Sequence, residues 1–420
     1  MRLQTERHLQ EFDQDIFSYK KLSKTILDQV LLKMELPNSF GIYGNWGSGK
    51  STMIHYILKH IENAPITYSS VTAVYFEPWK YEYSSHKDLL FALLSAIKQK
   101  SELEKSVWKT IMTDVLVVAS GVARKISVVD AQDTVADFEL VEGKVFKEHE
   151  LWVNKVQKFK EDFQIIVDQT LQKNNSKKLI VFIDDLDRCL PENAVNLLEG
   201  IKNFLSVDKV LFIFAIDKRI VGEMIEKKYG LHDGYGDEYL MKIIQYYYDL
   251  PKNNVEQLVV KLFQSYEIHF EDKQIKYISN FLKVFGGEPR IVKHYIHQLC
   301  MSIILSESSR ELLKNDTEQV WLQFLFVASY LLAKYPKIFS AGSNLIRLRF
   351  LRECAANRHN PAQPDSYEQS VKKDASINSH DLKKLEDIMG HPINTGKEGN
   401  PPALIDVNKL DIALRSIKVV

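Results

Sequence analysis

A glycine-rich run ending in Gly-Lys-Ser, "GIYGNWGSGKST" at residues 41–52, constrains the fold of this chain more than any other feature. The apolar residues at its start predict a short buried strand over 39–44, and the helical spacing after it predicts a helix. Glycines let a backbone fold around an anion with several N–H groups pointing inward, and the N-terminus of the next helix adds a positive dipole. The run therefore predicts a phosphate-binding loop between a strand and a helix.

The loop follows the pattern G-x-x-x-x-G-K-[ST]. We expect the Lys50 ammonium to reach the β- and γ-phosphates of a nucleotide, and the Ser51 hydroxyl to ligate Mg²⁺. The residues expected to bind the nucleotide are Gly44, Asn45, Trp46, Gly47, Ser48, Gly49, Lys50, Ser51 and Thr52. The alternative is a glycine-rich turn with a stray lysine, which the strand–loop–helix context disfavours.

A second motif, "LIVFIDDLDRC" at residues 179–189, places acidic residues directly after an apolar run typical of a central parallel strand. Because ligands of such sheets bind at the carboxyl ends of the strands, these carboxylates should lie beside the phosphate loop. We expect Asp184 to hold the Mg²⁺ shell and Asp185 to orient or polarise an attacking water. Arg188 is either a partner of these carboxylates or a phosphate contact for a neighbouring subunit. The alternative for this motif is an acidic surface turn.

Buried strands alternate with helices along the first half of the chain, which predicts an α/β fold: a three-layer αβα core with a parallel sheet. We expect this P-loop core to occupy residues 1–250 and an all-helical domain to occupy 251–420; the family resemblance described below implies that this second domain includes a lid. The other predicted features are a helix over 10–35, a strand over 72–76, a helix over 86–100, a poorly patterned insertion over 101–145, a helix starting at Trp152, a helix over 194–205, a strand over 210–217, helices within 253–335 and a loop-rich segment at 355–402.

The charge balance and the cysteines of the chain indicate which binding partners and which cellular compartment to expect. The chain has 55 Lys plus Arg and 55 Asp plus Glu, so a dominant attraction to nucleic acid or anionic membrane is not indicated, although nucleic-acid binding stays possible. Its 3 cysteines are far apart, which fits a reducing compartment and argues against zinc or disulfides. Residues 1–15 lack the apolar core of a signal peptide, and the apolar tract at 111–123 is too short to span a bilayer. We expect a cytoplasmic protein with no membrane partner.

Together, "GIYGNWGSGKST", "FEPWKYE" at residues 76–82 and "VFIDDLDRC" at 181–189 resemble the KAP family of P-loop NTPases, a family related to STAND and AAA+ ATPases that includes phage-exclusion proteins. The tryptophan in the loop, Trp46, is more particular than a bare phosphate-loop pattern. Further matches are "YLMKIIQ" at 239–245 and "GGEPRIVKHY" at 286–295. The resemblance implies an ATP- and Mg²⁺-dependent ATPase core with a helical lid, acting as a switch or motor in an assembly.

The resemblance implies roles for two further residues. Asp217 ends a strand where related ATPases place a polar residue that senses the γ-phosphate, and a helix N-cap is the competing interpretation. Arg290 resembles an arginine that contacts the nucleotide from the second domain, and a surface salt bridge is the competing interpretation. An arginine of that kind would couple the position of the lid to the state of the phosphate.

The sequence departs from the family in two places. The family often carries transmembrane helices between the two motifs, whereas residues 101–145 of this chain are too polar to span a membrane. Glu77 stands where many relatives carry a small polar residue, and either a water-orienting or a structural role fits it. We expect Trp79, in the same stretch, to be packed.

The expected function is that of an ATPase whose turnover is slow or stimulated by a partner, with Asp185, Lys50, Arg188 and Arg290 in catalysis. The expected partners are further copies of the chain, an effector protein or both, and anti-phage defence is the leading biological role. The first alternative is a DNA-loading or DNA-remodelling ATPase, which predicts a basic face and salt-dependent DNA binding. The second is a nucleotide-gated scaffold with little turnover. A small-molecule kinase is disfavoured because Asp-Asp-x-Asp-Arg after a strand suits water activation better than an acceptor pocket.

Overall fold

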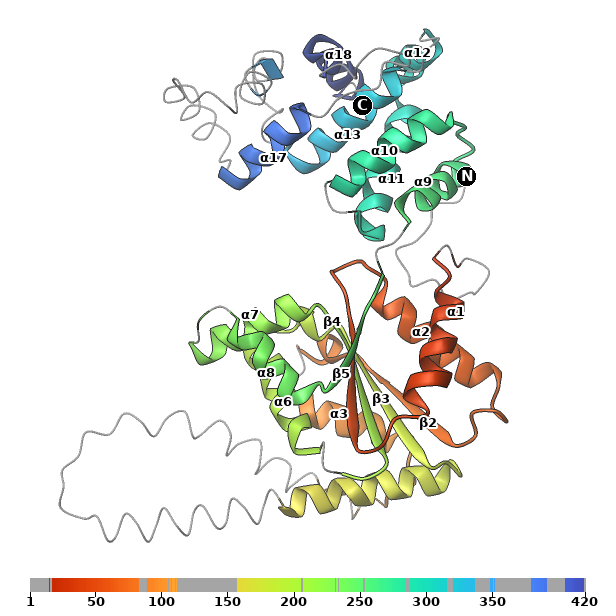
Figure 1. Cartoon of the computed structure of the whole chain (residues 1–420), viewed down its shortest axis with the longest axis vertical. Helices are drawn as coiled ribbons and strands as arrows, with labels where there is room; N and C mark the ends of the chain where they lie inside the picture. The colour runs from red at the N-terminus through yellow and green to blue at the C-terminus, as the bar shows by residue number, and fades with distance from the viewer. Residues whose placement is uncertain are drawn as a thin grey trace, which may run out of the picture. The chain divides into compact units, whose positions relative to one another are not determined.

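The fold is known from a computed structural model of the chain (Figure 1). Apart from a few single positions, the structure describes residues 17–82, 89–104, 157–204, 207–230, 234–251, 254–284, 287–315, 320–336, 379–390 and 405–418. Most of the insertion predicted at 101–145 lies outside these residues. The chain divides into two compact units, with the boundary between Pro251 and Lys252.

The first unit is built on a five-stranded sheet with the strand order β2-β3-β4-β1-β5. Each strand is parallel to its neighbours, so all carboxyl ends lie at one edge of the sheet. The strands are β1 (Asn38–Tyr43), β2 (Val71–Phe76), β3 (Lys178–Asp184), β4 (Val210–Ile216) and β5 (Tyr246–Asp249). The central strands are continuous apolar runs because helices cover both faces of the sheet.

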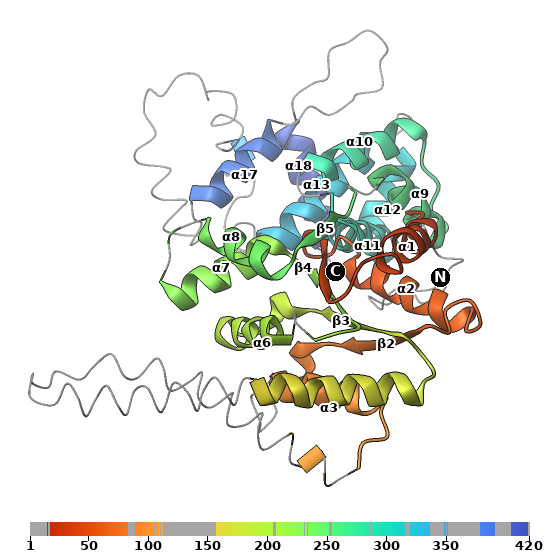
Figure 2. The ribbon, with the colours of Figure 1, turned by 60° about the horizontal axis from the view of Figure 1, so that its bottom comes forward.

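Helices flank the sheet in two layers, as Figures 1 and 2 show. One face is covered by α1 (Tyr19–Ile26), the π-helical turn η2 (Leu27–Leu31) and α2 (Lys50–Asn63). The opposite face is covered by α3 (Leu89–Lys98), a helix over 157–173, α6 (Pro191–Phe204), α7 (Lys218–Tyr229) and α8 (Tyr235–Ile243). The predicted three-layer αβα core with a parallel sheet is therefore present.

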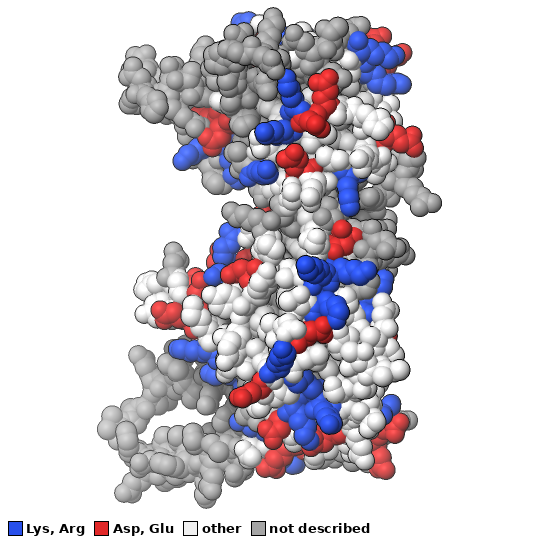
Figure 3. Space-filling model, turned by 45° about the vertical axis from the view of Figure 1, so that its right-hand side comes forward, with Lys and Arg blue, Asp and Glu red and all other residues white. Residues whose placement is uncertain are grey.

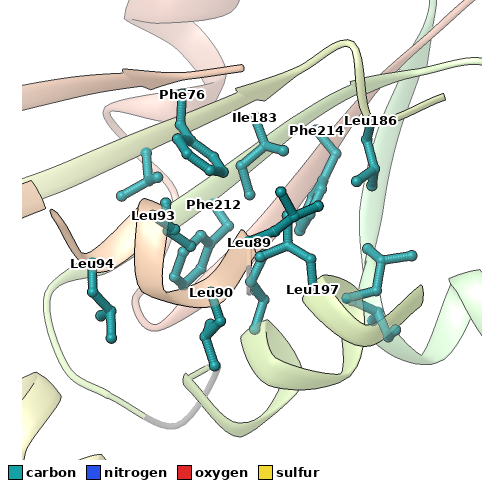
Figure 4. Close-up of a cluster of buried hydrophobic side chains, with 14 of the residues drawn as sticks. Phe76, Leu89, Leu90, Leu93, Leu94, Ile183, Leu186, Leu197, Phe212 and Phe214 are labelled. Carbon is teal, nitrogen blue, oxygen red and sulfur yellow. The ribbon is translucent and has the colours of Figure 1, made fainter. Parts of the chain in front are cut away.

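The alternation of side chains along the strands divides the apolar residues between two cores. Phe182 of β3 packs with α1 and α2, whereas its neighbour Ile183 points toward the opposite layer. Figure 4 shows Phe76, Phe212 and Phe214 projecting from the sheet toward the leucines of α3 and α6. Replacing a phenylalanine buried this fully by alanine typically lowers the free energy of unfolding by about 3–5 kcal/mol. The carboxyl edge of the sheet is thus held on a rigid base.

The second unit consists of helices throughout its described residues. They are α9 (Val255–Ser265), α10 (Asp272–Val284), α11 (Pro289–Leu305), α12 (Glu307–Asn315), α13 (Val320–Lys334), α17 (Ser379–Met389) and α18 (Val407–Lys418). The ring of Phe281 on α10 meets Phe326 and Tyr330 of α13 edge-on, with ring centroids 5.3 and 5.4 Å apart. Such aromatic pairs favour edge-to-face contact because ring edges are positive and ring faces negative.

The N-terminal helix is shorter than predicted at its carboxyl end. The described helical residues run from Tyr19 to Leu31 and are followed by a turn, whereas the prediction extended to residue 35. The Lys178 ammonium of β3 accounts for this end, since it donates to the carbonyl oxygens of Leu31, Leu32 and Met34 at 3.0, 3.0 and 3.2 Å. A cation at this position satisfies carbonyls that a helix end leaves without partners. Residues 10–14 lie outside the described residues.

Strand β5 and helix α17 show how elements were missed or misjudged from the sequence. Strand β5 was not predicted, because its tyrosines are largely exposed at the edge of the sheet and form no apolar run. Helix α17 lies inside the segment predicted to be loop-rich, and the buried Leu385, Ile388 and Met389 give it one apolar face. Of the helix predicted to start at Trp152, residues 157–173 are helical and the start lies outside the described residues.

Candidate nucleotide-binding site

The glycine-rich loop connects β1 to α2 at the carboxyl edge of the sheet. Gly47 and Gly49 have φ angles of 85° and 104°, a left-handed region that favours glycine. A Cβ atom on Gly49 would lie 2.6 Å from the ring of Tyr19, whose hydroxyl donates to the Ser48 carbonyl oxygen at 2.8 Å. At Gly47 and Gly49 the loop therefore has a backbone conformation that residues with a side chain rarely adopt, and the first turn of α2 follows directly.

The Lys50 side chain is buried under the loop, with only 8% of it exposed. Its ammonium donates to the carbonyl oxygens of Gly44 and Asn45, at 2.8 and 3.3 Å. It also lies 3.6 Å from Oδ2 of Asp187, a side chain that is 4% exposed. Ser51 follows in the first turn of α2, and its carbonyl oxygen is 2.7 Å from Nδ1 of His55.

Asp184 ends β3 and is 1% exposed. Its Oδ1 accepts from the backbone N–H of Asp185 at 2.9 Å, and its Oδ2 accepts from the Tyr75 hydroxyl at 2.9 Å. Burial and the neighbouring Asp184 carboxylate both raise the pKa of Tyr75, so this phenol stays a donor at neutral pH. The carboxylate is thereby fixed at the edge of the sheet where the loop also lies.

Asp185 has a φ of 57°, a left-handed conformation that aspartate tolerates better than most residues. Burial, and then the charge of Asp184, raises the pKa of Asp185 to about 6, while Arg188 opposes the rise. Nε of Arg188 lies 2.9 Å from Oδ1 of Asp185, and its guanidinium lies over the ring of Trp79, 5.6 Å from the centroid. Trp79 is 41% exposed, so the prediction that it is packed was wrong.

Comparison with known proteins places this site in a family. The model of the KAP family P-loop domain matches residues 18–324. The chain belongs to the KAP family. Among curated relatives, the phage T7 exclusion protein of Escherichia coli K12 is 26% identical over 265 residues, which cover 58% of this chain and 34% of that protein. An uncharacterized protein of Methanocaldococcus jannaschii is 62% identical over 34 residues, covering 8% of this chain and 18% of that protein. The matches therefore span about a third or less of the length of these relatives.

Solved structures resemble the KAP chain only distantly. The ORC2 protein of Aeropyrum pernix, in ADPNP and ADP complexes, has 14% identity and a TM-score of 0.35, covering 96% of this chain and 93% of its own. The ORC1 protein of the same organism, in complex with DNA, has 12% identity and a TM-score of 0.37, covering 94% and 90%.

Two residues that the sequence reasoning left without a role lie at the phosphate loop of the KAP chain. Asp187 contacts the Lys50 ammonium, and its Oδ2 also accepts from the backbone N–H of Asp217 at 3.1 Å. Arg219 lies in the first turn of α7, and its Nη2 is 3.1 Å from Oδ1 of Asn45. Asp187 could have been found from the sequence, because it is the third acidic residue of "DDLD" at 184–187. No sequence pattern indicated that Arg219 lies at the loop.

Asp217 caps α7, because its Oδ1 accepts from the backbone N–H of Arg219 at 3.2 Å. The competing interpretation as a helix N-cap is thus realised in the structure. Asp217 also lies at the carboxyl end of β4, whose last residue accepts through its carbonyl oxygen from the Gly44 N–H at 3.4 Å. Asp217 therefore follows directly after the residue of β4 that is hydrogen-bonded to the loop. The role of Asp217 as a phosphate sensor stays a prediction.

The other predicted residues, and Glu82, for which no role was predicted, lie around or away from this centre. Trp46 is 59% exposed at the loop. The Glu77 carboxylate pairs with the ammonium of Lys80. Glu82 accepts through Oε1 from the Leu190 N–H at 3.0 Å, which joins the segment after β2 to the start of α6. Arg290 lies half-buried in the first turn of α11, in the other unit, and its predicted contact with the nucleotide stays a prediction.

The donors at the site suit a nucleotide with Mg²⁺. A hydroxyl at Ser51 and a buried carboxylate at Asp184 are the oxygen ligands that this ion prefers, with phosphate oxygens and waters completing its shell. Within the described residues no group of three or more His, Cys, Asp and Glu side chains is arranged to hold a metal by protein ligands alone. No helix in the described part of the chain has both the length and the apolar character required to cross a bilayer.

Proposed function

We propose that this chain is a Mg²⁺-dependent ATP-binding and ATP-hydrolysing switch. The observation that carries the proposal is the meeting of a phosphate loop and three aspartates at one edge of the sheet, with the Lys50 ammonium 3.6 Å from Asp187. Asp184 and Asp185 belong to the same turn, and Asp185 has the raised pKa expected of a group that exchanges protons. Membership of the KAP family supports nucleotide binding.

The loop would bind the phosphates through its inward N–H groups and the first turn of α2. The Lys50 ammonium would exchange the neutral carbonyl oxygens of Gly44 and Asn45 for phosphate oxygens, because a cation is attracted more strongly to an anionic oxygen than to a neutral one. Ser51 and Asp184 would hold Mg²⁺, which supplies positive charge at the β- and γ-phosphates. Asp217 would sense the γ-phosphate from the end of β4.

Asp185 would accept a proton from the attacking water. With a pKa of about 6, its carboxylate is mostly ionised near neutral pH and still basic enough to take a proton. The ion pair with Arg188 competes for the same oxygen atom, Oδ1. We therefore infer slow turnover until Arg188 is drawn away, for instance by a phosphate or a partner protein.

In an assembly, Arg290 would contact the nucleotide from the helical unit and lose its partner when the γ-phosphate leaves. Further copies of the chain or an effector protein would read that change. The name of the E. coli relative, phage T7 exclusion protein, supports a role in excluding phage. On the face of the molecule in Figure 3, basic and acidic side chains are interspersed, so this face does not favour the DNA-remodelling alternative.

The test measures ATP binding, Mg²⁺-dependent ATP hydrolysis and assembly size for the full chain and for the variants Lys50→Ala and Asp185→Asn, with Lys227→Ala as the control. We expect Lys50→Ala to abolish binding and Asp185→Asn to bind ATP with little turnover, while Lys227→Ala, at the far end of α7, behaves as the parent. Failure of the parent chain to bind ATP would overturn the proposal.

Further measurements on these variants separate the alternatives. Equal function of Asp185→Asn and the parent would favour a scaffold without turnover. ATP-dependent DNA binding that weakens with salt would favour DNA remodelling. A change in assembly size with ATP supports the switch, and loss of phage exclusion with Lys50→Ala supports the defence role.

A further inference from the structure

Arg219 stands at the rim of the phosphate loop in a way that no sequence motif indicates. Its Nη2 lies 3.1 Å from Oδ1 of Asn45, the second residue of the loop, and 3.4 Å from Oδ2 of Asp217. The Asn45 carbonyl oxygen accepts from the Lys50 ammonium. Two cations therefore hold Asn45, Lys50 through its backbone and Arg219 through its side chain.

The backbone of Arg219 is fixed relative to the loop. Asp217, two residues earlier, caps α7 and donates its own N–H to Asp187, which faces Lys50. The Gly44 N–H donates to the carbonyl oxygen of Ile216, so β4 and the loop are joined directly. The start of α7 is thus hydrogen-bonded to the residues around the phosphate loop, whereas the long Arg219 side chain extends from it with most of its surface exposed.

The two cations each lie near one aspartate, Asp187 for Lys50 and Asp217 for Arg219, and differ in exposure. The Lys50 side chain is buried, whereas 66% of the Arg219 side chain is exposed. The acceptor that Arg219 uses on the loop is a neutral amide oxygen. A guanidinium gains more from a phosphate oxygen than from an amide, because hydrogen bonds between charged groups are stronger and can be bidentate. An anion at the rim would therefore displace Asn45 from Arg219.

We propose that Arg219 binds the terminal phosphate of a nucleoside triphosphate held in the loop of the same chain, exchanging the Asn45 amide for that phosphate. The inference rests on the proposed nucleotide binding and goes beyond it by naming a residue that distinguishes triphosphate from diphosphate. A guanidinium carries five donors on three nitrogens, so Arg219 can bind a phosphate oxygen while one nitrogen stays with Asp217. A lysine would offer a point charge without this fork.

The exchange would also link the state of the bound nucleotide to α7, the helix that carries Arg219. With a triphosphate bound, Arg219 would leave the Asn45 side chain for the γ-phosphate. With a diphosphate bound, the contact between Arg219 and Asn45 is retained. The γ-phosphate would thereby be read by a residue of the sheet unit itself, independently of Arg290 in the helical unit.

The experiment measures the affinities of the full chain for ATP and for ADP, each with Mg²⁺, by calorimetry. The variants are Arg219→Ala, Arg219→Gln and Arg219→Lys, with Lys227→Ala as the control because it removes an exposed charge from the other end of the same helix. We expect Arg219→Ala and Arg219→Gln to weaken ATP binding about tenfold or more, and ADP binding less than about twofold. Arg219→Lys should fall between them and the parent, and Lys227→Ala should match the parent.

Arg219→Gln guards against a folding artefact, since its amide can still pair with Asn45, and the thermal unfolding of each variant checks the fold. Equal affinity of parent and Arg219→Gln for ATP would overturn the inference, as would an equal loss for ATP and ADP. These results would leave the proposed function intact provided that Lys50→Ala still abolishes binding. A parent chain that binds neither nucleotide would instead overturn the proposed function.

Discussion

The side chains on the two sides of the phosphate loop differ in burial and in the partners that they contact. On the inner side, Lys50, Asp184 and Asp187 are almost completely buried and bonded to backbone or to one another. On the outer side, Trp46 and Arg219 are largely exposed, and Arg219 meets the loop through a neutral amide. In the proposed function, the inner side would offer the nucleotide a preformed geometry, and the outer side would offer contacts that the nucleotide changes.

Replacing Asp185, the proposed general base, should have the largest effect, because it would remove the proton acceptor from the inner side without removing the phosphate-binding loop. We expect Asp185→Asn to lower the turnover of ATP by a factor of about 10² to 10⁴ while leaving ATP affinity within about twofold. Asparagine also tolerates the left-handed backbone at this position, so the fold is retained. Single-turnover hydrolysis and equilibrium binding measure the two quantities, and a parallel loss of both would contradict the separation of roles.

Gly49 tests how rigid the inner side is. Alanine at this position would carry a φ of 104° and place its Cβ 2.6 Å from the buried ring of Tyr19. We expect Gly49→Ala to cost about 2–5 kcal/mol of the free energy of unfolding, the sum of a strained backbone and an overpacked contact.

Gly230→Ala is the matched control for Gly49→Ala. Its φ is 63° and nothing lies within 4 Å of its Cβ, so only the backbone cost of about 1–2 kcal/mol applies. Denaturant unfolding of both variants gives the comparison. Similar losses for the two would show that Tyr19 does not brace the loop.

The pKa of Asp185 makes the inner side sensitive to pH. Because folding raises this pKa from 3.8 to about 6, the fold disfavours the ionised form, and the stability lost through Asp185 grows as pH rises from about 4 to about 6. Near pH 4, the free energy of unfolding of Asp185→Asn should therefore be nearly the same as that of the parent. Above pH 6 it should be more stable by up to about 3 kcal/mol, at 1.36 kcal/mol per pKa unit.

Chemical denaturation of parent and Asp185→Asn between pH 4 and pH 8 measures this difference. A constant offset between the two proteins would contradict the raised pKa. The turnover of the parent should fall below pH 6 as Asp185 becomes protonated, since a protonated carboxyl cannot accept the proton of water.

The hydroxyl of Tyr75 offers a smaller change on the inner side. Tyr75→Phe removes the hydrogen bond to Oδ2 of Asp184 and leaves the ring in place. We expect the Mg²⁺ concentration for half-maximal hydrolysis to rise about tenfold, the usual scale for a partner that orients a metal ligand. Tyr247→Phe, at an exposed ring on β5, is the control and should change nothing. An unaltered Mg²⁺ requirement in Tyr75→Phe would argue against Asp184 as a ligand.

On the outer side, Trp46→Ala should have the smallest effect on the fold. Its exposure predicts a change in the free energy of unfolding within about 0.5 kcal/mol. If the ring contacts the bound nucleotide, affinity for ATP should fall about threefold, on the scale of one aromatic contact. A large loss of stability would show that the outer side is as firmly built as the inner side.

The parts predictable from the sequence were those that leave a local pattern. Strands β3 and β4 were found because strands buried on both faces are continuous apolar runs. Strand β5 left no such pattern because it lies at the sheet edge, and the end of η2 depends on Lys178, which is distant in sequence. Arg219 escaped notice because its partner, Asn45, lies 174 positions away.

The sequence by itself determined the phosphate loop, the acidic strand end and the αβα class, since each follows from a local spacing of glycines, apolar residues or carboxylates. Only the tertiary structure decided which residues meet at the loop. It pairs Lys50 with Asp187, Tyr75 with Asp184, Arg188 with Asp185 and Arg219 with Asn45. The reason is physical: parallel strands far apart in the chain bring their carboxyl ends to one edge, and burial there sets which charges face one another.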